Sequence, residues 1–386
     1  MIIVKESAPH LRRKATVTRM MVDALIALAP TLIFSFVVFP IKTLITYLSS
    51  LAIMIAAEFV FVGLKNMMPN DGLKHSFKER FAHSYKGKYT INNILTPAIS
   101  AVIFTLIMPA GAPVYAVILG ALFGIVVGKL VFGGLGSNIF NPAALGMVFA
   151  KLCFGSQYQA YVPTWYYSAP TVDVVTGATA LSPTTAIENE LSKLTNVVGN
   201  MNSDCYSPLN LFLGRIPGTL GEVYKITIII GLIYLLIRRS ADFRIVLSYL
   251  GTFAVLALIG GLSIYGLDQS VNPFKFLAYQ LLSGGVLFGA TFMLTDPVTS
   301  PINPPSRIIY GMVAAVATIF IRFFAALPEG VGFSILIANM VAVVLDHYEW
   351  SNPRYTWKKF LAMGLIVIIS ALTVFLVIFY GGVYGK

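Results

Sequence analysis

Charge is scarce in this chain. Only 11% of its 386 residues are Asp, Glu, Lys or Arg, whereas 57% are hydrophobic. A soluble domain carries about a quarter charged residues, so a soluble fold is excluded for most of the chain. Because a bilayer cannot satisfy exposed backbone polar groups, the segments that lie in lipid should be helices.

Cysteine is also scarce. The chain has only Cys153 and Cys205, and neither has a second cysteine at CxxC spacing. A zinc site or a four-cysteine iron–sulfur cluster within this chain is therefore excluded. The sequence also lacks a Walker loop, a strand–GxGxxG–helix unit and a GxSxG elbow. A standard nucleotide-binding domain is therefore not expected.

Long apolar runs recur along the whole sequence. A spanning helix needs about 20 mostly apolar residues. We therefore expect an all-α polytopic membrane protein with roughly ten core transmembrane helices and an extra C-terminal helix. The expected spans are 20–40, 43–64, 91–108, 114–131, 143–160, 223–237, 245–266, 275–294, 307–327, 331–345 and 360–380.

The net charge of +11 is concentrated in short segments between the apolar runs. That distribution is typical of the positive-inside rule, which argues against nucleic-acid binding. It places the N-terminus and segments 65–88, 238–244 and 352–359 in the cytoplasm. The long polar segment 161–222 then lies on the external side.

A weak internal repeat suggests how the spans are organised. The stretch TPAISAVIFTLIMPAGAP (96–113) recurs loosely as SGGVLFGATFMLTDPVTSP (283–301), in a span of opposite direction. Two similar spans of opposite direction, one in each half of the chain, fit a five-plus-five inverted repeat, as in many transporters. Chance similarity of apolar segments is the alternative. The predicted parts are an N-terminal half (1–160), an external loop (161–222), a C-terminal half (223–350) and an extension (351–386).

The stretch GGLGSNIFNPAALG (133–146) interrupts what would otherwise be a helical hairpin. Glycines such as Gly134 and Gly136 allow unusual backbone dihedrals and close backbone approach. The amides of Asn138 and Asn141 can bind a planar ligand that has both donors and acceptors. The alternative is an ordinary interfacial turn with asparagine caps.

Ionisable residues inside spans are expensive and mark functional sites. Three lie deep in the expected helices: Glu58, Lys151 and Arg322. Three others lie near helix ends, where they can snorkel: Asp23, Lys129 and Asp346. Asp296, in TDPVTSPINPPS, reads either as a solvated acid at a helix end or as a functional group. The candidates for an ion pathway are Glu58, Lys151, Arg322, Asp296 and Asp346.

The external loop contains DVVTGATALSP, residues 173–183. Thr179 follows two small residues, Gly177 and Ala178. One interpretation is a turn before a helix capped by Ser182, with Pro183 at its first position. The other is an attachment site for a covalently bound group.

Several motifs together resemble one membrane protein family, which comprises the D subunit of the Rnf complex and the B subunit of the sodium-translocating NADH:quinone reductase (Nqr). These motifs are SAPHLRR, GGLGSNIFNPA, DVVTGATALS, LTDPVTSP and ILIANMVAVVLDHY. The resemblance extends to about residue 354. Only about twenty residues precede the first span, which favours the Rnf type over the Nqr type. The run 360–380 departs from the family's usual pattern.

The resemblance implies that Thr179 carries FMN through a phosphoester bond. The matching motif residues are Asp173, Thr176, Gly177 and Ala178. It also implies a non-covalent riboflavin near the glycine-rich stretch, with Asn138 and Asn141 at its polar edge.

The same resemblance implies a subunit of an ion-pumping redox complex in a bacterial cytoplasmic membrane. Such a complex moves electrons between ferredoxin and NAD and couples them to sodium or proton transport. Iron–sulfur clusters and the NAD site then belong to partner subunits, and a flavin transferase attaches the FMN. The alternatives are a quinone-reducing Nqr-type subunit and a secondary transporter without a redox role.

Overall fold

The computed structural model describes residues 16–66, 79, 83–85, 89–158, 181, 193–202, 206–325, 327, 329–347 and 352–380. Helices dominate these residues, and the only β pairing among them is an isolated bridge between Pro109 and Thr219. The expectation of an all-α polytopic membrane protein is confirmed.

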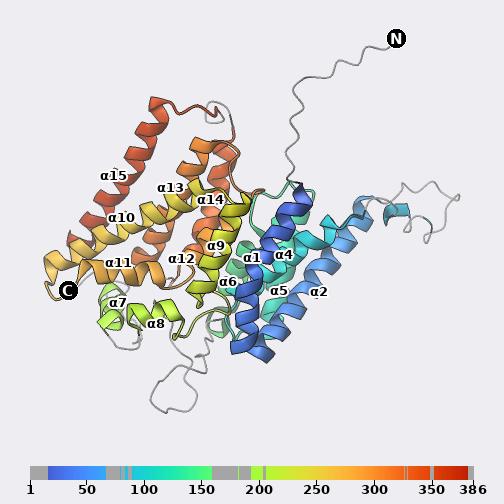
Figure 1. Cartoon of the computed structure of the whole chain (residues 1–386), viewed down its shortest axis with the longest axis horizontal. Helices are drawn as coiled ribbons and strands as arrows, with labels where there is room; N and C mark the ends of the chain where they lie inside the picture. Colours follow the sequence, from blue (N-terminus) through green and yellow to red (C-terminus); the bar gives the residue numbers. More distant parts are fainter. Residues whose placement is uncertain are drawn as a thin grey trace, which may run out of the picture.

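The helices fall into two groups along the chain (Figure 1). The first group consists of α1 (Val17–Val38), α2 (Pro40–Lys65), α4 (Asn92–Ile107), α5 (Val114–Ile125) with its π-helical end η1 (Val126–Leu130), and α6 (Pro142–Tyr158). Helices α7 (Lys193–Asn202) and α8 (Pro208–Leu213) come between the groups. The second group consists of α9 (Lys225–Arg238), α10 (Phe243–Leu267), α11 (Pro273–Leu282), α12 (Val286–Phe288) with its π-helical end η4 (Gly289–Met293), α13 (Pro304–Phe324) and α14 (Val331–Leu345). Helix α15 (Trp357–Tyr380) closes the described chain.

Local sequence explains where several helices begin. Asn272 caps α11 by accepting from the Phe274 and Lys275 amides, and proline follows at the first helical position. Asp242 caps α10 in the same way through the Arg244 amide. Such side-chain oxygens satisfy amides that have no partner within the helix.

Not every helix is long enough to span a bilayer alone. Five of the described helices are long and apolar enough to cross a membrane. The helices 273–282 and 286–293, which are bent by 59° relative to each other, count as a sixth if they form one span. Four others are apolar but shorter: Asn92–Ile107, Val114–Leu130, Pro142–Gly155 and Val331–Leu345. Length and composition thus identify five or six of the roughly ten expected transmembrane helices, and the exact number stays a prediction. Breaks in the backbone are tolerated at membrane depth when protein surrounds them, and the residues at the α11–α12 break are largely buried.

The two groups pack in the same order. Helix α2 packs against α4 and α5, as α10 packs against α11 and α13. Helix α5 pairs with α6, as α13 pairs with α14, and the groups meet through α1 with α9 and α6 with α14. An inverted repeat requires this arrangement. The repeat itself stays a prediction.

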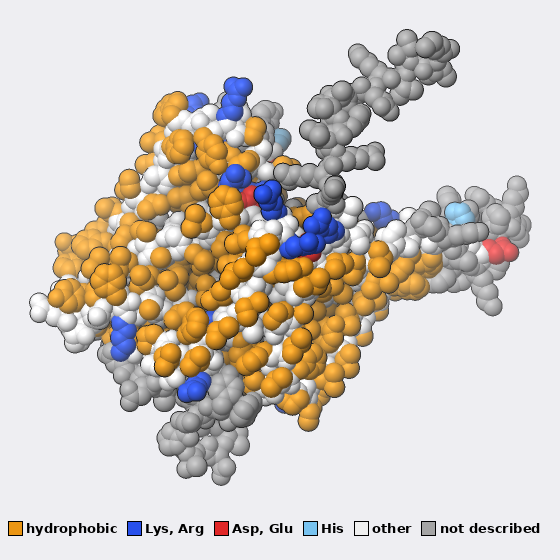
Figure 2. All heavy atoms as spheres, in the orientation of Figure 1, with side chains coloured by type: hydrophobic (Ala, Val, Ile, Leu, Met, Phe, Trp, Pro, Cys, Tyr) orange, Lys and Arg blue, Asp and Glu red, His pale blue; other side chains and the backbone are white. Residues whose placement is uncertain are grey.

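The molecular surface is mainly apolar around the helices (Figure 2). Large hydrophobic side chains are exposed on nearly every long helix, among them Val37, Leu48, Leu247 and Ile368. Monomeric soluble proteins rarely expose apolar patches larger than a few hundred Å². The exposed hydrophobic side chains on these helices are what a lipid-facing surface requires.

Helix α15 packs on the outside of α10 and α13. Its contact line is narrow, with Ser370, Val374 and Ile378 buried at intervals of four residues. Most of its other side chains are exposed. The extra C-terminal helix that the sequence predicts is therefore an outer helix that does not reach the interface between the two groups.

Glycines set the distance between α5 and α6. A Cβ on Gly124 would lie 2.9 Å from the Gly146 Cα and closer still to the Pro142 carbonyl oxygen. Gly120 and Gly128 lie one helical turn to either side. This small-residue spacing lets membrane helices approach closely.

We predict that Gly124→Leu lowers the stability of the protein in detergent by about 1–3 kcal/mol, because the new side chain overpacks the α5–α6 contact. Gly251→Leu is the matched control, since a Cβ there would meet no atom within 4 Å. Melting curves of the two variants give the comparison. Equal stability of both variants would contradict the packing role.

Candidate functional site

A cavity of about 320 Å³ lies where the two groups meet. It falls at the lower end of the size range of small-molecule sites. Residues of α1, α4, η1, α9 and η4 and the turn before α6 line it. Most of the lining is apolar, and the polar lining side chains include Thr96, Lys129, Asn138, Asn141 and Asp296. An apolar slot with a few convergent polar groups suits a flat, partly polar ligand.

Both predicted asparagines line this cavity. The Asn141 side chain accepts from the Ala143 and Ala144 amides at 3.0 and 3.3 Å, so it caps α6. Its Nδ2 donates to the Met293 carbonyl at 3.4 Å and so connects the turn to η4. Asn138 makes one long contact, from Nδ2 to the Phe140 carbonyl at 3.4 Å. Its amide therefore keeps hydrogen-bonding capacity for a ligand.

The glycines of the turn before α6 allow its unusual backbone conformation. Gly133, Gly134 and Gly136 have φ of 110°, 97° and 87°, a region that side chains rarely adopt. Gly134 and Gly136 are not among the residues that line the cavity, and a Cβ on Gly136 would meet no atom within 4 Å. The role of Gly134 and Gly136 in binding a cofactor therefore stays a prediction. They allow the turn that places Asn138 and Asn141.

A buried ion pair borders the cavity. Lys129 Nζ lies 2.8 Å from Glu58 Oε2 and donates to Thr96 Oγ1 at 2.9 Å. Both charged side chains are almost fully buried, at 3% and 2% exposure. The expectation that Lys129 snorkels is wrong, because η1 directs its side chain toward α2 and α4. Glu58 lies inside the protein, as its depth in the sequence predicts.

Asp23 is a second residue that does not snorkel. Its carboxylate accepts from Tyr234 at 3.2 Å, Arg238 at 3.1 Å and Ser240 at 2.8 Å. The side chain is 3% exposed. Asp23 therefore connects α1 to the end of α9. These two helices form one side of the cavity.

The two remaining acids of the predicted pathway lie at or near the loop that follows η4. Asp296 lines the cavity and accepts from the Val298 amide at 3.3 Å and the Thr299 hydroxyl at 3.2 Å. Asp346, at the end of α14, accepts from the Ile302 amide at 3.0 Å. Both are half-buried. Only Asp296 reaches the cavity.

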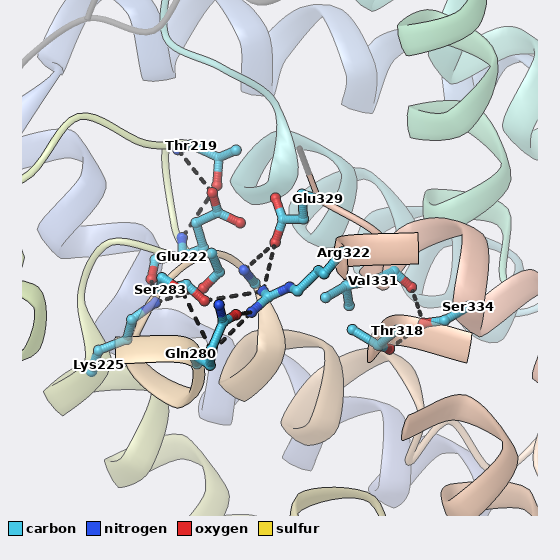
Figure 3. Close-up of polar contacts among 12 residues, drawn as sticks. Thr219, Glu222, Lys225, Gln280, Ser283, Thr318, Arg322, Glu329, Val331 and Ser334 are labelled. Atoms are coloured by element: carbon cyan, nitrogen blue, oxygen red, sulfur yellow. Dashed lines mark hydrogen bonds and ion pairs between the residues drawn. The ribbon is translucent and has the colours of Figure 1, made fainter. Parts of the chain in front are cut away.

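Lys151 and Arg322 belong to a different cluster, near the break between α11 and α12. Figure 3 shows Arg322 in this cluster, close to Gln280, Ser283 and Glu329. Arg322 donates to the Gln280 carbonyl at 2.8 Å and the Ser283 carbonyl at 3.1 Å. Lys151 Nζ donates to the Glu329 carbonyl at 3.3 Å. Arg322 and Lys151 are buried, at 3% and 7% exposure. The structure thus places Glu58 and Asp296 at the large cavity, Lys151 and Arg322 at the helix break, and Asp346 at neither.

Three members of this cluster, Glu222, Lys225 and Glu329, are not singled out by the sequence. Each lies at the end of an expected span or in a short connection, where a charge is normally solvated. The one local signal is the pair of glycines 284 and 285, which interrupts an apolar run. Gly284 has a φ of 61° and allows the helix break that these charges surround.

The predicted flavin-attachment motif lies outside the described residues. This holds for Asp173, Thr176, Gly177, Ala178 and Thr179. Leu181, two residues after Thr179, is described and is 4% exposed. It lines a small cavity with Glu222, Lys225 and Glu329, which places Leu181 beside the second cluster.

These features define a multi-pass helical membrane protein with a ligand-sized cavity and two groups of buried charges in its interior. Residues 4–354 match the NQR2, RnfD, RnfE family. The chain belongs to this family, and α15 lies beyond the matched region.

Two relatives illustrate the match. The chain is 37% identical over 253 residues to the B subunit of the Na(+)-translocating NADH-quinone reductase of Chromohalobacter salexigens, a stretch that covers 65% of this chain and 57% of that relative. It is 27% identical over 376 residues to the D subunit of the ion-translocating oxidoreductase complex of Haemophilus influenzae, covering 90% of this chain and 96% of that relative. The first match thus spans under two thirds of that relative's length.

Proposed function

We propose that this chain is the membrane-embedded flavoprotein subunit of an ion-translocating oxidoreductase complex of the Rnf type. FMN attached to Thr179 and a riboflavin in the cavity between the two helix groups carry electrons across the membrane. Partner subunits hold the iron–sulfur clusters and the NAD site, because this chain's two cysteines provide no cluster ligation of their own. The redox chemistry belongs to the cofactors, and the chain supplies their positions.

The cavity is the observation that carries this proposal. The chain's relatives bear names that specify ion-translocating redox complexes, and such a role needs a place for a redox cofactor. The cavity volume and the free hydrogen-bonding capacity of Asn138 suit the polar edge of a flavin ring. The buried Lys129, paired with Glu58, borders the same space.

The positions of the two flavin sites support a path across the membrane. The cavity includes the start of α1 and the turn after α9, which the positive-inside rule places on the cytoplasmic side. Thr179 belongs to the loop that the same rule places on the other side. A carrier near each surface is what electron transfer through the membrane requires.

An Nqr-type role is the second candidate. The relative with 37% identity is a quinone reductase subunit. The near full-length match to an Rnf-type subunit favours the first candidate. Electron transfer from ferredoxin without added quinone, measured in membranes that contain the complex, distinguishes the two.

The cavity assignment predicts one riboflavin per chain. Acid extraction of Thr179→Ala complex followed by chromatography should yield it, because the covalent flavin is then absent. Asn138→Leu should remove the riboflavin while the complex stays assembled, since Asn138 caps no helix. Asn66→Leu is the control, because Asn66 donates to its own helix and does not line the cavity. A riboflavin content near zero in the Thr179→Ala complex would contradict the assignment.

A further inference from the structure

Four arginines lie at the turn between α9 and α10, on the side that the positive-inside rule places in the cytoplasm. This arginine cluster consists of Arg19, Arg238, Arg239 and Arg244. Arg19 belongs to the first turn of α1 and reaches the cluster through Asp23, which lies 4.0 Å from Arg19 and 3.1 Å from Arg238. Figure 2 shows Lys and Arg side chains gathered near the upper ends of α1 and α9, with hydrophobic side chains around them.

The acids in contact with the cluster do not balance its charge. Asp23 is buried and forms its close ion pair with Arg238. Asp242 lies 3.5 Å from Arg244, but the same carboxylate oxygen also binds Arg307. The four arginines therefore contact only these two carboxylates among the described residues, and a fifth arginine shares one of them. Positive charge is in excess at this turn.

Arg239 is the member of the cluster that contacts within the protein explain least. Its φ of 56° lies in the left-handed region that glycine normally occupies at the end of a helix. A side chain in this conformation raises the free energy of the turn. Arg239 is exposed, and its guanidinium has no hydrogen bond or ion pair with any residue that the structure describes. The side chain is therefore available to a ligand outside the chain.

Exposed hydrophobic side chains adjoin the arginines. Ile237 directly precedes Arg238, and both Ile237 and Leu247 are strongly exposed. Phe243 is exposed as well, and the Arg244 guanidinium lies over its ring at 5.3 Å from the centroid. Exposed apolar side chains of a spanning helix face the acyl chains of lipids, and a charge beside them reaches the headgroup level. A phospholipid has the same order of groups, with acyl chains next to a phosphate.

The chemistry of arginine favours an anionic lipid over a neutral one. A guanidinium donates two parallel N–H groups to phosphate oxygens and stays charged. Basic pockets between membrane helices on the cytoplasmic side bind acidic headgroups. A zwitterionic headgroup would bring a further positive charge to a turn that already has an excess. The acidic surface of a soluble partner would match the charge of the arginines, but it would not use the apolar side chains beside them.

We propose that the arginine cluster binds the headgroup of one anionic phospholipid of the cytoplasmic leaflet. Arg239 and Arg244 contact its phosphate. The acyl chains lie against Ile237 and Leu247. None of the four arginines lines the large cavity, so this site is separate from the proposed flavin site. The bound lipid adds a second connection between the cytoplasmic ends of α1, α9 and α10, beside the ion pair of Asp23.

Photolabelling of the purified complex tests the proposal. Phosphatidylglycerol with a diazirine in one acyl chain should cross-link to segment 237–247, which mass spectrometry of the peptides identifies. In the double variant Arg239→Gln with Arg244→Gln, the lipid concentration for half-maximal labelling should rise about 30-fold, equivalent to about 2 kcal/mol. Lys42→Gln is the matched control, because Lys42 is exposed at the other end of the membrane-spanning helices; it should leave the labelling unchanged.

The lipid headgroup is varied in the same assay. A phosphatidylcholine with the same diazirine chain should label segment 237–247 weakly and equally in the parent and the double variant. Glycerophosphoglycerol, which has the headgroup but no acyl chains, should not displace the photoreactive lipid at equal concentration. Displacement by this compound would overturn the assignment to a lipid, because the phosphate alone would then be recognised.

The remaining outcomes are equally decisive. Equal labelling by phosphatidylglycerol in the parent and the double variant would overturn the proposal. Loss of a partner subunit from the double variant, with labelling unchanged, would assign the arginines to a protein interface instead. If the double variant does not assemble, Arg239→Gln alone decides, since its side chain pairs with no described residue. The half-maximal concentration should then rise about fivefold.

Discussion

Thr179→Ala should abolish covalent flavin attachment completely. The proposed phosphoester needs the threonine hydroxyl, and alanine has no oxygen to form it. On a denaturing gel under ultraviolet light, the parent chain should give a fluorescent band and the variant none. Non-covalent flavin is lost on denaturation, so the gel reports only the covalent group.

Thr176→Ala is the informative control for that experiment. Thr176 is the other threonine close to Thr179 in the motif. It should affect attachment less, because its hydroxyl is not the acceptor. A fluorescent band that persists in Thr179→Ala and disappears in Thr176→Ala would reassign the attachment site. Expression without a flavin transferase should give no band in any variant.

Breaking the Glu58–Lys129 pair should be strongly destabilising. Each partner is almost fully buried, so Glu58→Gln leaves the ammonium group of Lys129 without its countercharge. Removal of one member of a buried pair costs about 3–5 kcal/mol. The loss of folded protein on heating in detergent, followed by size-exclusion chromatography, measures the effect.

The double variant gives the sharper test of this pair. Glu58→Gln combined with Lys129→Met removes both charges, and an apolar replacement of a buried pair is often neutral. We expect it to recover much of the stability lost in Glu58→Gln. Lys42→Met, at an exposed position of α2, should change little. If the double variant is less stable than the two single variants predict, the pair is not the source of the effect.

The sequence predicts the helical regions well, because the period and length of apolar runs are local properties. The prediction for α14, residues 331–345, matches the structure at both ends. The sequence does not reveal which helices are too short to cross a bilayer alone. Length in the sequence does not show where the backbone breaks inside a run, as it does at Ser283–Gly285.

The buried charges show a different limit. Glu58 and Arg322 can be recognised in the sequence because they lie in the middle of apolar runs. Lys129 and Glu222 cannot, since each lies near the end of a run, where sequence position alone indicates exposure. Their burial depends on helices distant in the chain that cover them, such as α2 for Lys129. Only tertiary packing provides that information.

Helix α15 has a consequence for the neighbours of this protein in the plane of the membrane. It occupies the outer side of α10 and α13, the counterparts in packing order of α2 and α5. Among the described residues, no helix covers α2 and α5 in that way, and Leu44, Leu48 and Val60 are exposed there. Proteins are made from the N-terminus onward, so α10 and α13 remain open until the last helix is inserted. A neighbouring subunit that contacts the outer side of α10 and α13 must therefore bind before α15 packs there, or must bind to α15 itself. The outer side of α2 and α5 stays open throughout assembly.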